Sequence, residues 1–366
     1  MISEAFKKIS VFKTFTTSVG LDIGSYSLKL AKMRKNKGQY ELLYCGIKEI
    51  PPGTIAGSEI KNREVLLDSI VTLINQCDPS ISDVIVSMSG FGIITDKINI
   101  HVDPTSDPEE IILWEAGQRS PFDVDDITLD YKILNKNEKT NTYEVLLVAA
   151  KNKIMQSYID LLYEANLRPV IIDGDAFAIK NAYMLGKDPA DLETEGVVVL
   201  INIGEGETNV IFSKNGQFLF NRDCRTAGES FAKNLQKITN VDKPQMKYLL
   251  SGRFDSSVNR DDIKKSVQSA SEELAVEIDS LINYFKQTEK NEGNEPEQIS
   301  KIVLSGGGAL IKGIKDFFEK RFKIPLEISN PLEHLKFDID LFGKINPAAI
   351  APLLTVCIGL AMRDVK

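Results

Sequence analysis

The sequence predicts an α/β fold built from two related halves, and three observations support this prediction. Residues 19–29 read as an apolar strand, a glycine turn and a second strand. Residues 199–210 repeat that pattern at a constant offset of 180 positions. A third glycine turn, within 301–309, follows another apolar strand. An internal repeat of this length predicts two domains that face each other, and two facing hairpins are able to grip a polyphosphate from both sides.

Composition and charge restrict the class of protein. The chain has 366 residues, of which 43% are apolar, so two or three domains with full cores are expected. The formal net charge is −8, which argues against a general nucleic-acid binder because such a protein carries a basic stripe. Four separated cysteines and two histidines favour a reducing cytoplasm and argue against a zinc site, a disulfide framework or a Ser-His-Asp site.

The N-terminal segment, 1–18, is predicted to be amphipathic. Residues 1–48 hold nine Lys or Arg and three Asp or Glu, and lack the apolar run of a signal peptide. Apolar side chains recur at helical spacing at Ile2, Phe6, Ile9 and Phe12. A helix of this kind fits an anionic membrane surface, and it fits equally a helix that docks on a partner or on its own domain.

The first domain begins with the hairpin and is predicted over 19–91. Gly24 lets backbone N–H groups approach an anion without a Cβ in the way. Ser25 and Ser27 add hydroxyl donors, and Lys29 adds positive charge. A turn of this composition is more often only a turn, so the phosphate role depends on the repeat. The pattern then predicts a helix around 65–74 and a buried strand over 83–88.

Residues 92–168 read as an inserted α/β subdomain. Asp107 as N-cap and Pro108 at the first helical position open a helix that must end before Pro121. The predicted order is strand, helix, strand, strand, helix, strand, which is typical of a small α/β sandwich. The other elements of this order are predicted at 93–102, 127–134, 143–149, 153–165 and 168–172.

The chain then returns to the first domain at 169–195. Here Asp173 and Asp175 precede a helix predicted over 176–185. An acidic residue in this place can hold a water or a metal, although capping a helix is its commoner role. The second domain is predicted in two parts, at 196–230 and 298–340. A helical subdomain at 231–297 lies between these parts, and its helix over 261–287 keeps a strict three-to-four spacing of apolar residues.

The third glycine turn joins a strand ending at 305 to a helix predicted over 310–322. Its three successive glycines let the backbone lie close to a flat ligand and place a helix N-terminus there. The GxxxxGK[ST] phosphate loop is absent from the sequence. The remaining part, 341–366, holds the longest uncharged run, 345–362. Because this run contains prolines and polar residues, it favours a buried helix beginning near Pro352 over a membrane span.

The order of these elements resembles the actin-like ATPase superfamily, which has a duplicated, ribonuclease H-like fold. In that superfamily two such hairpins hold the phosphates and the last glycines hold the adenosine. Finer features resemble one family in the FtsA-like branch of this superfamily, the type IV pilus assembly proteins PilM. The motifs that carry this resemblance lie at 20–25, 120–122, 129–131, 172–177, 304–310, 328–331, 351–354 and 359–361. The resemblance covers the chain from Gly20 to the C-terminus.

This resemblance implies an actin-like fold with an inserted small α/β subdomain and a role in the pilus machine. The expected protein is a cytoplasmic, ATP-binding scaffold at the periphery of the inner membrane. It captures the cytoplasmic N-terminal tail of PilN and works with other inner-membrane components, with its oligomeric state left open. In PilM-like proteins the tail lies in a groove beside the inserted subdomain, where it binds as an extended peptide. We expect this groove around 91–122.

The resemblance also assigns the nucleotide site residue by residue. The first phosphate loop is expected at Asp22, Gly24, Ser25, Tyr26, Ser27 and Lys29, and the second at Gly204, Glu205, Gly206 and Glu207. The ribose side is expected at Gly228, Glu229 and Lys233, and the border of the adenine at Gly306, Gly307, Gly308 and Lys312. Asp175 lies where the superfamily positions the attacking water, and Asp22 with Asn202 would hold Mg²⁺.

One departure from the superfamily pattern is Asn202, which stands where an Asp is usual. An amide cannot act as a base, and it gives a magnesium shell less negative charge than a carboxylate. Glu205 and Glu207 add negative charge near the expected phosphates. The sequence therefore predicts that ATP binds through Mg²⁺ and is hydrolysed slowly or not at all.

Two other classes of actin-like protein remain as alternatives. A division protein of the FtsA kind shares the inserted subdomain but typically ends in a membrane-binding helix after a linker, whereas this sequence stops directly after a predicted buried helix. A sugar kinase needs a catalytic Asp in a sugar-binding loop, and the inserted subdomain offers no such loop. Both alternatives are therefore less favoured than the pilus scaffold.

Overall fold

The computed structural model describes residues 16–36, 38–103, 105–119, 122–239, 241–253, 258–291 and 297–363. The amphipathic helix expected over 1–18 lies outside the described residues apart from its last three positions. Those three belong to the first strand, β1 (Thr16–Ile23).

The first sheet has six strands in the order β10-β6-β1-β2-β3-β16. The three N-terminal strands pair antiparallel, whereas β6 and β10 join parallel to β1. Helices α1 (Arg63–Cys77) and α3 (Asn152–Glu164) contribute to the hydrophobic core on one face of this sheet. The other strands are β2 (Ser27–Asn36), β3 (Gln39–Glu49), β6 (Asp83–Met88), β10 (Arg168–Gly174) and β16 (Lys336–Phe337).

The second sheet repeats five of the six strands of the first and has no counterpart of β16. Its order is β13-β12-β11-β14-β15, again with three antiparallel strands followed by two parallel ones. Asp22 pairs with Lys29 across the first hairpin, and Asn202 pairs with Asn209 at the same place in the second. The predicted duplication is confirmed. The strands are β11 (Val197–Ile203), β12 (Thr208–Lys214), β13 (Gln217–Cys224), β14 (Ile299–Ser305) and β15 (Leu326–Ile328).

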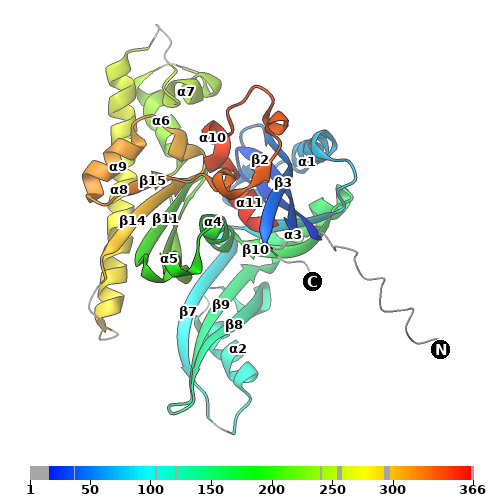
Figure 1. Ribbon diagram of the computed structural model, residues 1–366, viewed down its shortest axis with the longest axis vertical. Helices are drawn as coiled ribbons and strands as arrows, with labels where there is room; N and C mark the ends of the chain where they lie inside the picture. Colours follow the sequence, from blue (N-terminus) through cyan, green and yellow to red (C-terminus); the bar gives the residue numbers. More distant parts are fainter. Residues whose placement is uncertain are drawn as a thin grey trace, which may run out of the picture.

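Two helices, α4 (Asp175–Met184) and α11 (Thr355–Ala361), pack between the two sheets (Figure 1). They share one hydrophobic core with Ile85 of β6 and Leu200 of β11. The C-terminal uncharged run thus forms a buried helix, as predicted, and among the described residues no helix is long and apolar enough to cross a bilayer.

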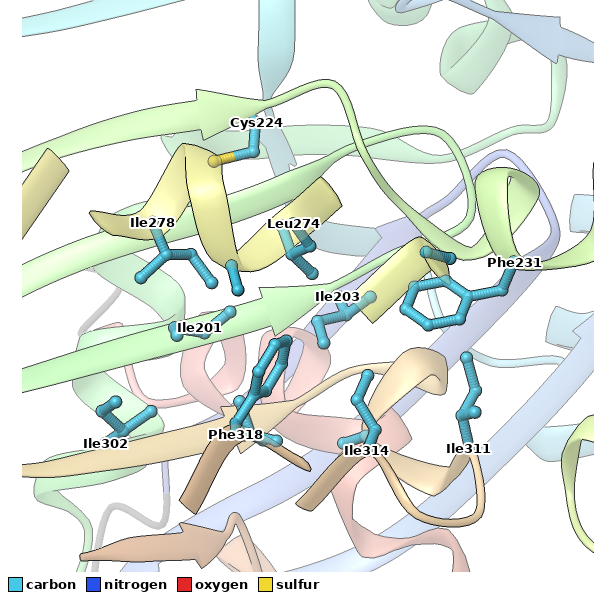
Figure 2. Packing of buried hydrophobic residues seen from close by; sticks show 14 of the residues in the cluster. Ile201, Ile203, Cys224, Phe231, Leu274, Ile278, Ile302, Ile311, Ile314 and Phe318 are labelled. Atoms are coloured by element: carbon cyan, nitrogen blue, oxygen red, sulfur yellow. The ribbon is translucent and has the colours of Figure 1, made fainter. Parts of the chain in front are cut away.

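The second sheet has its own helical layer, led by the long helix α8 (Arg260–Asn291) at the left of Figure 1. Figure 2 shows Leu274 and Ile278 of α8 packed above Ile201 of β11, with Phe318 on the opposite side. The apolar spacing that predicted α8 is therefore its core-facing stripe. The other helices of this layer are α6 (Gly228–Ile238), α7 (Lys243–Leu250) and α9 (Ile314–Phe322).

The inserted subdomain is smaller than predicted. It has a three-stranded sheet in the order β7-β9-β8 and one helix, and it extends away from the two large sheets (Figure 1). The expectation that α3 and β10 complete it is wrong, because β10 pairs with β6 and Leu161 of α3 lies in the core of the first sheet. Its elements are β7 (Ile93–His101), α2 (Pro108–Arg119), β8 (Ile127–Asn137) and β9 (Thr142–Lys151).

The remaining elements are short and lie between the larger ones. They are β4 (Ile55–Ala56), β5 (Glu59–Ile60), α5 (Pro189–Thr194), α10 (Pro347–Ile350) and the single-turn helices η1 (Gly90–Gly92), η2 (Val124–Asp126), η3 (Gly307–Leu310), η4 (Pro331–His334), η5 (Ile339–Phe342) and η6 (Ala351–Leu354).

Candidate functional site

The tips of the two glycine hairpins touch each other. A Cβ placed on Gly206 would lie 3.2 Å from the Ser25 hydroxyl oxygen, so the two turns are in van der Waals contact. These turns lie 180 residues apart in the sequence, and the fold brings them together because β1 and β11 occupy the same position in their sheets. The site for a polyphosphate would lie between them.

The first hairpin carries an ion pair directly behind its turn. The Lys29 Nζ lies 3.1 Å from a carboxylate oxygen of Asp22, and both side chains are less than one-sixth exposed, at 15% and 12%. A Cβ on Gly24 would lie 3.1 Å from the same Nζ. The ammonium group therefore sits against the backbone of the turn, where an arriving anion would meet it.

In the equivalent place, the second hairpin has hydrogen-bonded uncharged side chains instead of an ion pair. Asn202 Nδ2 donates a hydrogen bond to Asn209 Oδ1 at 3.0 Å, and the Ser305 hydroxyl donates to Asn202 Oδ1 at 3.1 Å. Asn209 Nδ2 in turn donates to an Asp223 carboxylate oxygen at 2.9 Å. Both polar ends of the Asn202 side chain thus have partners inside the protein. The amide at this position fits the network, whereas a carboxylate would lack the donor.

Asp175 is the first residue of α4 and is half-buried near Asp22. Burial raises its pKa well above the ordinary value, and the nearby Asp22 carboxylate raises it further, whereas a hydrogen bond with Ser87 acts in the opposite direction. Gly174, not Asp175, is the residue at the N-cap position of the helix. A raised pKa favours the protonated form of this carboxyl, and the protonated form cannot accept a proton from an attacking water.

A second half-buried carboxyl, Glu207, ends the turn of the second hairpin. Burial raises its pKa to about 7, and the Asp223 carboxylate adds to the effect, while hydrogen bonds with Ser89 and Asn209 partly offset it. Burial also raises the pKa of Asp223. The pKa of the neighbouring Tyr158 is raised by burial and by the charges of Glu207 and Asp175. Asp175, Glu207 and Asp223 therefore make this side of the site acidic.

Lys247 of α7 is a cleft residue that sequence reasoning missed. Its Nζ lies 3.6 Å from a Glu205 carboxylate oxygen and over the ring of Tyr26, so it joins the tips of both hairpins. Burial lowers the pKa of Lys247 to about 8, although Glu205 and Glu49 raise it. Burial and a hydrogen bond with Glu49 raise the pKa of Tyr26. The sequence around Lys247 has no motif that distinguishes it from other helix lysines.

The N-terminus of α6 is attached to the second hairpin. Gly228 N–H donates to the carbonyl oxygen of Gly204 at 2.8 Å, and Glu229 N–H donates to that of Glu205 at 2.9 Å. Lys233 pairs with Glu229 at 3.0 Å. Beside them, between α6 and α8, is a shallow cavity of about 510 Å³. It is lined by Ser230, Lys233, Asn234, Gln236, Lys237 and Glu273.

The third glycine turn packs against the end of β11. Gly306 has a φ of 79°, and a Cβ there would lie 2.8 Å from Asn202 Oδ1, so only glycine fits. The helix predicted over 310–322 begins instead at Ile314, because Gly313 has a φ of 93° and interrupts the helix before it. The turn leads into η3, so no long helix points its N-terminus at it. Lys312 lies nearby, with its backbone N–H bonded to the Leu250 carbonyl oxygen at 2.9 Å.

The structure thus brings several of the predicted residues together where the two hairpins meet. The second turn contacts both the first turn and the start of α6, and Asp175 lies near Asp22. Within the described part of the chain, no three His, Cys, Asp or Glu side chains form a group that could hold a metal ion. The roles of these residues toward a nucleotide remain predictions.

Comparison with known proteins identifies the family. The model of the family described as type IV pilus assembly protein PilM matches residues 20–365. Among solved structures, a chain of a PilM-PilN type IV pilus biogenesis complex is similar with a TM-score of 0.81 and 22% identity, over 96% of this chain and 99% of that one.

Two further solved structures show the same fold at lower similarity. The ethanolamine utilization protein EutJ from Carboxydothermus hydrogenoformans has a TM-score of 0.56 and 13% identity, over 95% of this chain and 89% of that one. MreB 5 of Spiroplasma citri, bound to AMPPNP, has a TM-score of 0.52 and 13% identity, over 94% of both chains. The predicted actin-like ATPase fold is confirmed.

Proposed function

The chain belongs to the family of type IV pilus assembly proteins PilM, and we propose that it is an ATP-binding scaffold that captures the cytoplasmic N-terminal tail of PilN. The observation that carries the nucleotide part is the contact between the two glycine hairpins, with the Lys29 ammonium behind the first turn. Backbone N–H groups and a cation at one point are what a phosphate needs. A relative of the same fold is described as bound to AMPPNP.

ATP together with Mg²⁺ fits this cleft better than ATP alone. The carboxyls of Asp22, Glu205 and Glu207 would repel a polyphosphate, and a divalent cation between them would remove that repulsion. Mg²⁺ usually keeps several waters and binds through one or two carboxylates together with phosphate oxygens. Asp22 is the carboxylate placed for this, with Asn202 across the cleft as the weaker ligand.

We expect bound ATP to be hydrolysed slowly or not at all. The group in the position of the water-activating residue is Asp175, whose pKa is raised well above the ordinary value by burial and by the Asp22 carboxylate, which favours its protonated form. Asn202, in the other half of the site, is neutral and uses both ends of its amide within the protein. An amide cannot act as a general base, and a raised pKa leaves less of Asp175 in the ionised form that could.

The partner part of the proposal is based on the family and on the inserted subdomain. The most similar structure named above is described as a PilM-PilN complex. Within the region expected to hold the groove, α2 exposes Leu113 and Trp114, at 37% and 62% of their surface. Exposed apolar side chains are the anchors that an extended peptide uses in addition to its main-chain hydrogen bonds. Capture of a PilN tail would place this protein beside the inner membrane.

Titration calorimetry tests the nucleotide part. Wild-type protein is expected to bind Mg-ATP, and Lys29→Ala is expected to lose that heat because the cation behind the turn is gone. Lys61→Ala is the matched control, since it removes an exposed lysine that pairs with Glu59 at the surface. The absence of heat from wild type at millimolar ATP would contradict ATP binding.

Fluorescence anisotropy with a labelled peptide of the PilN tail tests the partner part. Saturable binding by wild type is expected, with a scrambled peptide of the same composition as the control. Trp114→Ala is expected to weaken binding by about tenfold if this side chain is an anchor, since interface tryptophans typically contribute more than 1 kcal/mol. Equal affinity for both peptides would contradict the assignment of PilN as the partner.

A further inference from the structure

The outer side of helix α2 carries apolar side chains that the fold leaves exposed. Ile112 points into the core of the inserted subdomain, and Trp114, two residues later, lies on the opposite side of the helix with 62% of its surface exposed. Leu113 is 37% exposed, and Val124 of η2 is 51% exposed. A Cβ on Gly117 would lie 3.2 Å from Val124, so η2 packs beside this part of α2. An exposed patch around a tryptophan is typical of a protein–protein contact.

The charge around this outer face, formed by Leu113, Trp114 and Val124, is strongly negative. Of the 52 Asp or Glu and 44 Lys or Arg in the chain, nine acidic residues and one basic residue lie within 103–130, which leaves 43 of each sign elsewhere. Eight of the nine acidic side chains are exposed. The one basic residue, Arg119, pairs with Glu115 at 3.2 Å. The formal net charge of the whole chain, −8, is therefore carried by the region that bears the outer face.

The acidic side chains come from more than one element around α2. Glu109 and Glu110 lie in the first turn of α2, and η2 adds two aspartates directly after Val124. Burial raises the pKa of Tyr131 on β8, and the charges of Glu109, Asp107 and Asp130 raise it further, so these carboxylates lie near one another. A cationic segment with apolar side chains would complement this surface in both charge and hydrophobicity.

The chain itself contains a segment of that chemistry, residues 1–15. Its apolar residues Ile2, Phe6, Ile9 and Phe12 recur at helical spacing, and it has three lysines against one glutamate. A basic amphipathic helix is the type of segment that lays its apolar side on an exposed apolar face. Residues 1–15 and the outer face are therefore complementary surfaces encoded in one chain.

The position of Thr16 favours the outer face of a second copy. β1 runs parallel to β6, and β6 leads directly into η1 and β7. Thr16 begins β1, so it lies at the end of the sheet opposite to the entry of the subdomain, about 26 Å away for a strand of eight residues. The subdomain extends away from both large sheets (Figure 1). If 2–12 form the predicted helix, residues 13–15 span at most about 10 Å.

We propose that the outer face of α2 and η2 binds residues 1–15 of a second copy of this chain, with Trp114 as the central anchor and the surrounding carboxylates facing the lysines. Such a contact is heterologous, because one copy supplies the segment and the other supplies the face. Each added copy brings a new face and a new segment, so copies join head to tail. The inference goes beyond the proposed function. Since Trp114 is also a proposed anchor for the PilN tail, segment and tail would exclude each other there.

Fluorescence anisotropy with a labelled peptide of residues 1–15 tests the contact directly. The receptor is the full-length variant Lys7→Glu/Lys8→Glu, whose own segment competes weakly. Adding Trp114→Ala to this receptor should weaken binding by about tenfold or more. Tyr163→Ala is the matched control, since Tyr163 is an exposed aromatic residue of α3, at 58%. Equal affinity of the Trp114→Ala and Tyr163→Ala receptors would overturn the inference.

The charge part of the contact has its own test in the same assay. A peptide carrying Lys7→Glu/Lys8→Glu should bind the face more weakly than the wild-type peptide. A receptor carrying Asp125→Lys/Asp126→Lys should reverse this order, because the sign of the charge beside Val124 is then reversed. An unchanged order of the two peptides would contradict recognition of the lysines by the carboxylates.

Sedimentation velocity of full-length protein tests the head-to-tail arrangement. Wild type should associate further as its concentration rises, whereas Trp114→Ala and Lys7→Glu/Lys8→Glu should each remain monomeric. A mixture of these two variants should form one-to-one pairs, because the first keeps an intact segment and the second an intact face. A mixture that stays monomeric would overturn docking between copies, since a segment bound to its own chain offers no such complementation.

Two further outcomes separate this inference from other roles of the segment. If the 1–15 peptide binds vesicles that contain phosphatidylglycerol but not the protein, the segment is a membrane anchor and the inference fails. If the PilN tail peptide binds the protein and the 1–15 peptide does not, the proposed function stands and the inference alone fails. Binding of the 1–15 peptide without binding of the tail peptide would support the inference and contradict PilN as the partner.

Discussion

Glu207 makes the stability of this protein depend on pH in a definite direction. Its pKa is about 7 in the folded protein against 4.5 for the free side chain, so the folded state holds this proton more tightly than the unfolded state. The stabilisation from this group is complete below about pH 4.5 and is lost as the pH rises through about 7. A difference of this size corresponds to on the order of 3 kcal/mol.

Glu207→Gln removes this titration and keeps the size of the side chain. Urea denaturation should give similar free energies of unfolding for variant and wild type near pH 5. At pH 8 the variant should be more stable by on the order of 3 kcal/mol at most, because the wild-type carboxyl is then ionised and buried. The same difference at both pH values would show that Glu207 does not titrate in this range.

Asn202→Asp tests the neutral network of the second hairpin. The new carboxylate would face Asn209 Oδ1, to which the amide now donates, so two acceptors would meet. The melting temperature in the absence of Mg²⁺ should fall, by the equivalent of about 1–3 kcal/mol for an unsatisfied buried group. Mg-ATP should then raise it more in the variant than in wild type, because a carboxylate is the better ligand. Equal stabilisation of both by Mg-ATP would contradict Asn202 as a metal-facing position.

At the scale of elements, the crossing of α11 over α4 depends on a glycine. Gly359 lies so close to the carbonyl of Ala178 that a Cβ would overlap it. Gly359→Ala should therefore lower the free energy of unfolding by about 1–3 kcal/mol or more, although alanine favours the helix.

Ala361→Gly in the same helix is the comparison, with an expected loss of about 1–2 kcal/mol, because it lowers helix propensity and removes one buried methyl group. Thermal denaturation of both variants makes the comparison. If Gly359→Ala were as stable as wild type, the helices would not be packed at the distance that the structure shows.

Local patterns predicted the elements whose signals lie within one stretch of sequence. The two hairpins and α8 are of this kind, because glycine turns and apolar spacing are local. The place of β10 could not be predicted in this way, because its pairing is not local. Arg168 of β10 pairs with Asp83 of β6, which lies 85 positions earlier in the sequence. The start of α9 was also missed, because Gly313 has a left-handed conformation and the helix begins after it, four residues later than the glycine run indicated.

At the scale of the whole molecule, the sequence predicted the two hairpins of the site but not the residues that other elements add to it. The offset of 180 residues located both hairpins, and the structure places their tips in contact. The position of Lys247 could not be predicted, because α7 has no repeat or motif of its own. Asp223 and Glu207 belong to the repeat, but the repeat does not indicate that their side chains reach Gly90 of the other domain. Contacts of this kind depend on how the two domains face each other.

The central claim is that the two hairpins form one clamp that holds ATP without breaking it. The most direct measurement is to incubate wild-type protein with Mg-ATP, remove free nucleotide by gel filtration, and identify the bound nucleotide by chromatography. The account predicts about one nucleotide per chain, recovered as intact ATP. Recovery of ADP would contradict slow or absent hydrolysis, and recovery of no nucleotide would contradict the clamp itself.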